Sequence, residues 1–136
     1  MVEEKMELNH FMNHLGFKIN KIEAGLIEGE LNIEPHHRQQ IGFLHGGVIA
    51  TLADLVAGFA AYTLVKNEET VVTAELKISY FNPGVGDTAF CRGFVLKSGQ
   101  KLIFSEAEIF VNNNGQDILV AKSSATFAIV ELQKLI

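Results

Sequence analysis

Asp54 is the residue whose surroundings most strongly suggest chemistry. It carries the one charged side chain between Gly46 and Val65, a stretch that is otherwise apolar or small. On a helix turning 100° per residue, small residues surround it and leave it open to approach. These residues are Gly47, Ala50, Thr51, Ala57, Gly58 and Ala61. A carboxylate in such a setting loses hydration and is a candidate base or nucleophile. The alternative is a solvated helix face, but such a face normally carries several Lys, Glu or Gln residues, and this one carries none.

The start of the same helix predicts a second kind of chemistry. The first N–H groups of a helix lack intrahelical partners and lie at the positive end of the helix dipole. Here they belong to Gly46, Gly47 and Val48, and the two glycines leave the backbone open to a ligand oxygen. The pattern fits an oxyanion or carbonyl-binding site. It fits equally a glycine-rich helix start with His45 as its cap.

The two features face different directions. His45 and Asp54 are nine residues apart, which is half a turn out of phase on one helix. A His–Asp pair within one chain is therefore not expected. Our hypothesis is a site shared by two protomers, in which the helix start of one faces Asp54 of the other. A homodimer is then the minimum unit, because the small-residue face needs a cover.

The rest of the chain predicts the elements that must position these groups. A bulky apolar face of the same helix is expected to lie on a sheet, with the Asp54 side turned away from it. The bulky residues are Val48, Ile49, Leu52, Leu55, Val56, Phe59 and Tyr62. Spacing predicts a short amphipathic helix over residues 3–15, and period-two alternation predicts six strands. The expected strands are 17–23, 26–33, 71–82, 88–98, 101–112 and 117–130.

This order predicts one α+β domain over residues 1–136, with an antiparallel sheet around one buried helix. Within the polar linker 34–43, His36 and His37 are expected to be solvated turn residues. His10 and His14 are one helical turn apart, a spacing that metals can use. No third ligand is evident, so the sequence predicts solvated histidines and no metal.

Three segments together resemble a known family. GFLHGGVIATLAD (42–54), YFNPGVGD (80–87) and DILVAKSSATF (117–127) are similar to the hotdog-fold acyl-CoA thioesterases, within them the phenylacetyl-CoA and medium-chain acyl-CoA type. The resemblance covers roughly residues 15–130. It implies the hotdog fold, an acyl-CoA substrate, no cofactor, and a homodimer that pairs into a tetramer.

The resemblance also implies roles for individual residues. The Gly46 N–H would polarise the thioester carbonyl, with Gln39 holding that carbonyl or the attacking water. Asp54 of the opposing protomer would attack the carbonyl or activate water, and His45 would shape the loop. Thr73 matches a pocket position near the carboxylate. Alternation instead groups Thr73 with the polar side of its strand. The alternative that Thr73 is a surface residue with no role in the site therefore remains.

Contacts to the CoA moiety are less defined by the sequence. Gly47 is expected to contact substrate at the helix start. Lys97, Lys101 and Lys122 lie near strand ends, where they could meet the CoA phosphates. Exposed lysines at such places also serve solubility, and the resembled family often has an arginine where this chain has Gln100 and Lys101.

Composition excludes several classes of partner. The net charge of −5 gives no basic surface for nucleic acid. Asp54 would cost roughly 2.5 to 3.5 kcal/mol in a membrane-spanning helix, so no membrane span is expected. The single cysteine, Cys91, is expected to pack in a strand. With no signal peptide evident, a cytoplasmic protein is expected.

Two other functions remain open at this stage. One is a non-catalytic acyl-CoA-binding module of the same fold. Such a module would not need the carboxylate of Asp54, which is present in this chain. The other is a hotdog-fold hydratase or dehydratase. It would need an acid–base histidine and a carboxylate in one pocket, which the half-turn offset allows only across a protomer interface.

Overall fold

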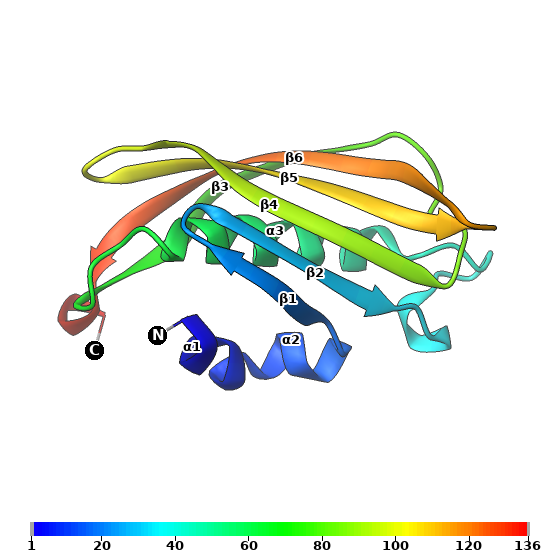
Figure 1. Cartoon of the computed structure of the whole chain (residues 1–136), viewed down its shortest axis with the longest axis horizontal. Helices are drawn as coiled ribbons and strands as arrows, with labels where there is room; N and C mark the ends of the chain where they lie inside the picture. Colours follow the sequence, from blue (N-terminus) through cyan, green and yellow to red (C-terminus); the bar gives the residue numbers. More distant parts are fainter. Residues whose placement is uncertain (1, 136) are drawn as a thin grey trace.

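The computed structural model describes residues 2–135 and shows one antiparallel sheet curved around a long helix (Figure 1). The helices are α1 (Val2–Leu8), α2 (His10–Leu15) and α3 (Gly46–Tyr62), with short 3-10 helices η1 (Pro35–His37) and η2 (Leu132–Lys134). The strands are β1 (Lys18–Glu23), β2 (Leu26–Asn32), β3 (Glu69–Tyr80), β4 (Thr88–Ser98), β5 (Leu102–Asn113) and β6 (Gln116–Glu131). Their order in the sheet is β1-β2-β4-β5-β6-β3. The predicted α+β class and hotdog arrangement are confirmed.

The sheet contacts the small side of α3 as well as some of its bulky residues. Ala53, Ala57 and Ala60 are fully buried together with Leu52 and Val56. A Cβ atom at Gly93 of β4 would overlap the backbone of Val56, so strand and helix lie unusually close. Small side chains permit this approach.

The prediction that the bulky face alone lies on the sheet is therefore wrong. Ala57 and Ala61, expected on the open side with Asp54, are fully buried, whereas Val48 and Leu55 are only partly buried. The reason is that the contact at Gly93 is nearly backbone to backbone. Such a contact requires small side chains on the helix and excludes bulky ones.

The N-terminal segment forms two helices where one was predicted. Asn9 separates them, and its Oδ1 accepts a hydrogen bond from the Met12 N–H at 3.0 Å. An asparagine side chain that caps a helix in this way begins a new helix and interrupts the previous one. Val2 and Met12 are buried in the core, which holds both short helices against the body of the protein.

Strand β3 contains a bulge that changes which face its residues occupy. Thr73 pairs with Phe127 and Glu75 pairs with the adjacent Thr126, so Ala74 is an extra residue. Regular alternation would place Thr73 on the side of Glu75. The bulge instead places it on the inner face, toward α3, with Leu76.

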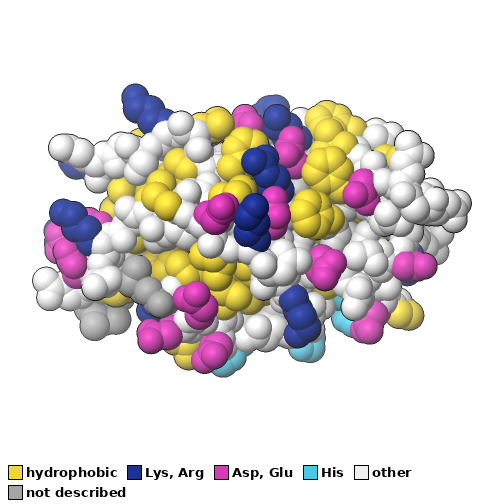
Figure 2. Space-filling view, viewed as in Figure 1, with side chains coloured by type: hydrophobic (Ala, Val, Ile, Leu, Met, Phe, Trp, Pro, Cys, Tyr) yellow, Lys and Arg dark blue, Asp and Glu magenta, His cyan; other side chains and the backbone are white. Residues whose placement is uncertain are grey.

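The outer face of the sheet carries charged side chains framed by apolar ones, and Figure 2 shows this mixture. Arg92 lies 3.6 Å from Glu28 and 3.5 Å from Glu108, and Lys122 lies 3.4 Å from Glu106. Lys122 is therefore paired on the sheet face. Exposed pairs of this kind contribute little stability individually.

Three further features concern the cysteine, the possible metal ligands and the hydropathy of the helices. Cys91 is fully buried, and burial raises the pKa of its thiol. Within residues 2–135, no three His, Cys, Asp or Glu side chains are grouped so that they could hold a metal ion. Over the same residues, no helix combines the length and the hydropathy needed to cross a membrane.

Candidate active site

Asp54 lies in the middle of α3 and is held by a residue of β3. The Thr73 hydroxyl donates a hydrogen bond to Asp54 Oδ1 at 2.8 Å. This contact exists because the bulge at Ala74 turns Thr73 inward. No hydrogen bond or ion pair within residues 2–135 occupies the other carboxylate oxygen, Oδ2. The carboxylate is thus oriented by one donor and keeps an oxygen for further chemistry.

Asp54 and Thr73 line a cavity of about 550 Å³. Its walls mix apolar and polar residues and come from α3, from β3, from β6 and from the N-terminal segment around α1 and the start of α2. The apolar wall residues are Leu8, Leu55, Phe59, Val71 and Phe127, and Tyr62 adds an aromatic ring. An oriented carboxylate beside these apolar residues suits a reaction on a group carried by an apolar chain.

At the start of α3, His45 satisfies most of the free N–H groups. Its Nδ1 accepts from the Gly47 N–H at 2.8 Å, and its carbonyl accepts from Val48 at 3.0 Å and Ile49 at 3.1 Å. The Gly46 N–H has no acceptor within residues 2–135. Gly46 therefore offers the open donor. Gly47, also expected to contact substrate, already donates its N–H to His45.

Because Nδ1 of His45 accepts a hydrogen bond, the proton of the neutral imidazole lies on Nε2. The ring is exposed and caps the helix. It is not in contact with Asp54, and no His–carboxylate pair forms there.

Gln39 and Tyr80 lie beside Gly46. Gln39 Oε1 accepts from the backbone N–H groups of Ile41 at 2.5 Å, Gly42 at 2.9 Å and Phe43 at 3.3 Å. Its amide NH₂ has no acceptor within residues 2–135 and is a free donor. The Tyr80 hydroxyl donates to the Gly46 carbonyl at 2.8 Å. All three residues line a second cavity of about 380 Å³.

Tyr80 is a site residue that the sequence reasoning missed. Alternation placed it on the inner face with Leu76 and Ile78, and it opens the segment YFNPGVGD. Nothing in the pattern showed that its hydroxyl would reach the start of α3. Only the tertiary contact between β3 and α3 identifies it.

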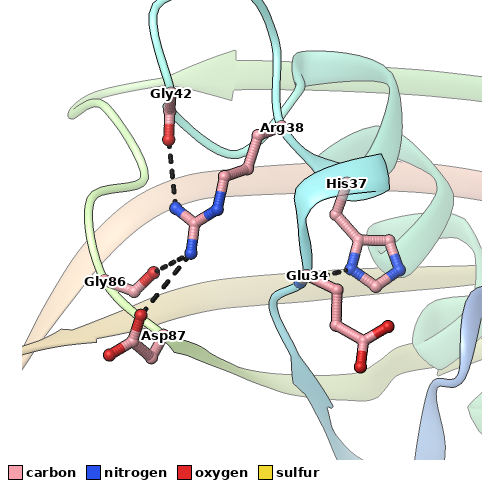
Figure 3. Close-up of polar contacts among 6 residues, drawn as sticks. All are labelled: Glu34, His37, Arg38, Gly42, Gly86 and Asp87. Atoms are coloured by element: carbon pink, nitrogen blue, oxygen red, sulfur yellow. Dashed lines mark hydrogen bonds and ion pairs between the residues drawn. The ribbon is translucent and has the colours of Figure 1, made fainter.

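The linker before α3 is held rigidly by Arg38 and His37 (Figure 3). The Arg38 guanidinium donates to the carbonyls of Gly42 at 3.0 Å and Gly86 at 3.2 Å and lies 3.5 Å from Asp87 Oδ1. It thereby joins the loop that carries Gln39 to the loop before β4.

The prediction of a solvated His37 is wrong, because this side chain is only 1% exposed. Its Nδ1 accepts from the Glu34 N–H at 3.0 Å (Figure 3). Its Nε2 lies 2.8 Å from the Leu15 carbonyl, to which it donates. His37 thus ties the linker to the end of α2.

One protomer presents two separate half-sites. Asp54 and Thr73 form a carboxylate half-site, and Gln39, Gly46 and Tyr80 form a donor half-site. Gly46 and Asp54 are eight residues apart on α3, which is about 12 Å along its axis. The two half-sites line different cavities, so they do not face one substrate atom within one protomer.

Lys97 and Lys101 lie far from the donor half-site of their own protomer. The Lys101 carbonyl accepts from the Ile129 N–H, and Ile129 pairs with Val71. Lys101 therefore lies at the level of Val71 in the sheet. Val71 is nine residues before Tyr80 on β3, so the two residues are about 30 Å apart along the strand. Both lysines are exposed at the β4–β5 hairpin.

Comparisons with known proteins agree with this fold. The human protein acyl-coenzyme A thioesterase 13 (Homo sapiens) is 28% identical over 129 residues, covering 93% of this chain and 89% of the relative. Proofreading thioesterase EntH of Klebsiella pneumoniae is 33% identical over 75 residues, and the match spans only 55% of each chain. A crystal structure of a thioesterase family protein from Silicibacter pomeroyi superposes with a TM-score of 0.94 at 29% identity, covering 96% of both chains.

Residues 41–118 match the model of a family described as the thioesterase superfamily. This range is more than half of the chain, and it contains both Gly46 and Asp54. Thioester hydrolysis is the general activity that these relatives support. The chain therefore belongs to the thioesterase superfamily.

Proposed function

We propose that this protein hydrolyses acyl-CoA thioesters in a site built from two protomers. The observation that carries the proposal is the hydrogen bond from Thr73 to Asp54 at the side of a cavity that Leu55, Phe59 and Phe127 also line. CoA thioesters are proposed as the substrate class because one of the relatives above is an acyl-coenzyme A thioesterase.

In this mechanism, the donor half-site of one protomer binds the thioester carbonyl. The free N–H of Gly46 and the free amide of Gln39 donate to the carbonyl oxygen and stabilise the negative charge that develops there. Asp54 of the second protomer attacks the carbonyl carbon or removes a proton from an attacking water. The carbon–sulfur bond then breaks, and the CoA thiolate leaves and takes up a proton. Where Asp54 attacks directly, water then cleaves the mixed anhydride and regenerates the carboxylate. By either route water supplies the second oxygen of the free acid.

Strand β3 supports the shared site because it is an edge of the sheet. An exposed edge strand offers unpaired N–H and C=O groups to a second strand. Two copies that pair antiparallel around Lys77 would place Thr73 of one copy opposite Tyr80 of the other, once the extra residue Ala74 is counted.

This pairing would join the two kinds of half-site. Thr73 is bonded to Asp54, and Tyr80 is bonded to Gly46. Each dimer interface would thus contain two complete sites related by a two-fold axis. A tetramer made of two such dimers is the assembly that the resemblance implies, and it is part of the proposal.

The same pairing supports Lys97 and Lys101 as contacts for the CoA phosphates. Both residues lie at the end of the sheet opposite the donor half-site of their own protomer. Antiparallel pairing brings this end toward the donor half-site of the partner, where the thioester would be bound.

The hydratase alternative is less well supported by the geometry. An acid–base histidine would need a free nitrogen and a nearby carboxylate. His45 uses Nδ1 to accept the Gly47 N–H, and its ring makes no contact with Asp54.

The proposal is tested by release of free CoA thiol from short, medium, long and aromatic acyl-CoAs. We expect Asp54→Asn to lower the turnover of the preferred class by about 10²-fold or more, because an acid–base or nucleophilic group is lost. Asp117→Asn makes the same chemical change at an exposed strand position and should retain activity. Equal activity of Asp54→Asn and wild type would refute the role of Asp54. No turnover of any ester would favour a binding module.

A further inference from the structure

The cavity beside Asp54 contains an unpartnered hydroxyl group. Tyr62, in the last turn of α3, lines this cavity and is only 5% exposed. Its hydroxyl has no hydrogen-bond partner within residues 2–135. The Ser105 and Ser123 hydroxyls are sealed in the core without partners, whereas that of Tyr62 remains accessible. An accessible hydroxyl on a residue that lines a cavity can donate a hydrogen bond to a bound ligand.

A second donor lines the same cavity. Lys5 of α1 is partly buried there and forms no ion pair within residues 2–135. Burial, followed by the charge of Glu4, raises the pKa of Tyr62, so its phenol stays protonated and acts as a donor. Asn9, which separates α1 from α2, and His10, the first residue of α2, also line the cavity. The part of the cavity formed by these short helices is therefore rich in polar hydrogen atoms, whereas the intervening walls are apolar.

The spacing along α3 indicates the length of group that would bridge the two regions. Tyr62 lies eight residues after Asp54, which is about 12 Å along the helix axis. An extended chain advances by roughly 1.2 Å per bond, so about ten bonds would cover this length. The longer side chain of Tyr62 leans further toward the N-terminus of α3 than that of Asp54, which shortens the distance that a ligand must cover.

We infer that the cavity accepts medium-length acyl groups that carry a hydrogen-bond-accepting oxygen, a hydroxyl or a carboxylate, at the end distant from the thioester. Tyr62 and Lys5 are then specificity-determining residues that donate to this oxygen. The inference rests on the proposed thioesterase function and adds the chemical class of acyl group. Neither residue takes part in bond breaking, which stays at the Asp54 end of the cavity.

The test uses acyl-CoAs of six, eight and ten carbons, each ending in a methyl, a hydroxyl or a carboxylate. We expect wild type to prefer an oxygen-ended ester over the methyl-ended ester of equal length in kcat/KM. Tyr62→Phe removes only the hydroxyl and should reduce this preference about tenfold, the upper scale for one hydrogen bond. Thermal unfolding of Tyr62→Phe checks that the variant is folded.

Lys5→Gln separates the two kinds of oxygen. Loss of its charge should lower the preference for the carboxylate-ended ester more than that for the hydroxyl-ended ester, and Lys5→Arg should restore it. Lys18→Gln is the matched control, because Lys18 is an exposed lysine that lines a different cavity. An effect of Lys18→Gln equal to that of Lys5→Gln would overturn the role of Lys5.

Failure of the inference is distinguishable from failure of the proposed function. If the methyl-ended esters are hydrolysed best and Tyr62→Phe leaves every ratio unchanged, the inference is overturned while the thioesterase function stands. If no ester is hydrolysed, binding of the same panel to Asp54→Asn, with and without Tyr62→Phe, is measured by calorimetry. Tighter binding of oxygen-ended esters that depends on Tyr62 supports the inference, and equal binding overturns it.

Discussion

At the level of single residues, hydrogen bonds determine which atoms remain free for a ligand. His45 occupies the Gly47 N–H and leaves that of Gly46 open, and the Gln39 carbonyl oxygen is used while its amide is free. Thr73 uses one oxygen of Asp54. The donors and the carboxylate are therefore positioned before any substrate binds, which is a requirement for electrostatic stabilisation of a transition state.

The burial of the Cys91 thiol can be tested through the pH dependence of the free energy of unfolding. Because burial raises its pKa, the folded state keeps the thiol proton at pH values where the unfolded chain, with a thiol pKa of about 8.5, loses it. Above pH 8.5 the unfolded state thus binds fewer protons, and the free energy of unfolding falls as pH rises. We expect the contribution of Cys91 to the free energy of unfolding to decrease by about 1.4 kcal/mol between pH 7.5 and pH 9.5.

Urea unfolding of wild type and Cys91→Ala at the two pH values measures this contribution. Other titrating groups affect both proteins alike, so the difference between their pH dependences isolates Cys91. The same pH dependence in both proteins would show that the thiol is accessible in the folded state.

At the level of elements, the close contact between α3 and β4 is the feature that most depends on one residue. A Cβ atom at Gly93 would meet the backbone of Val56, which cannot move as a flexible side chain does. We expect Gly93→Ala to lower the free energy of unfolding by about 2 kcal/mol or more, the scale of an overpacked core.

Chemical denaturation measures this loss, with Gly46→Ala as its control. A Cβ atom at Gly46 would lie 3.7 Å from the Tyr80 ring, an ordinary contact, so that variant should lose much less stability. Equal stability of Gly93→Ala and wild type would mean that helix and sheet are further apart than described.

The sequence predicts well which segments are helices and which are strands. It predicts less well which side of each helix or strand faces the core. The six strands and the long helix follow from period-two and helical spacing, and His45 and Gly46 lie at the helix start as expected. Alternation could not predict the inward position of Thr73, because a bulge has no signature in the alternation that it interrupts, and only the family resemblance indicated a pocket position. The buried face of α3 differs from the prediction because helical spacing marks bulky residues as buried, whereas the contact at Gly93 requires small residues.

At the level of the whole molecule, the account depends on pairing through β3. In an antiparallel pair centred on Lys77, the two copies of this residue face each other with Cα atoms about 4.5–5.5 Å apart, which suits a disulfide. We expect Lys77→Cys to form a disulfide-linked dimer under mild oxidation, as seen by non-reducing electrophoresis.

Lys18→Cys is the control, because Lys18 is exposed on β1, the opposite edge of the sheet. It should remain monomeric on the same gel. Crosslinking through Lys18→Cys alone would place the interface at the wrong edge, and a monomer in sedimentation experiments would exclude the shared site altogether.

The most direct test of the shared site is complementation between two inactive variants. Asp54→Asn removes the carboxylate, and Gly46→Pro removes the open N–H. Proline suits the first position of a helix, and His45 has the extended φ of −61° and ψ of 136° that a following proline requires. Gly46→Ala keeps the N–H and serves as the control.

In a heterodimer of Asp54→Asn and Gly46→Pro, one site carries both changes and the other carries neither. Random pairing makes half of the dimers mixed, so coexpression should restore about a quarter of wild-type thiol release, although each variant alone is inactive. Activity of the coexpressed mixture no greater than that of the separate variants would contradict the account, because it would place Gly46 and Asp54 in one site of the same chain.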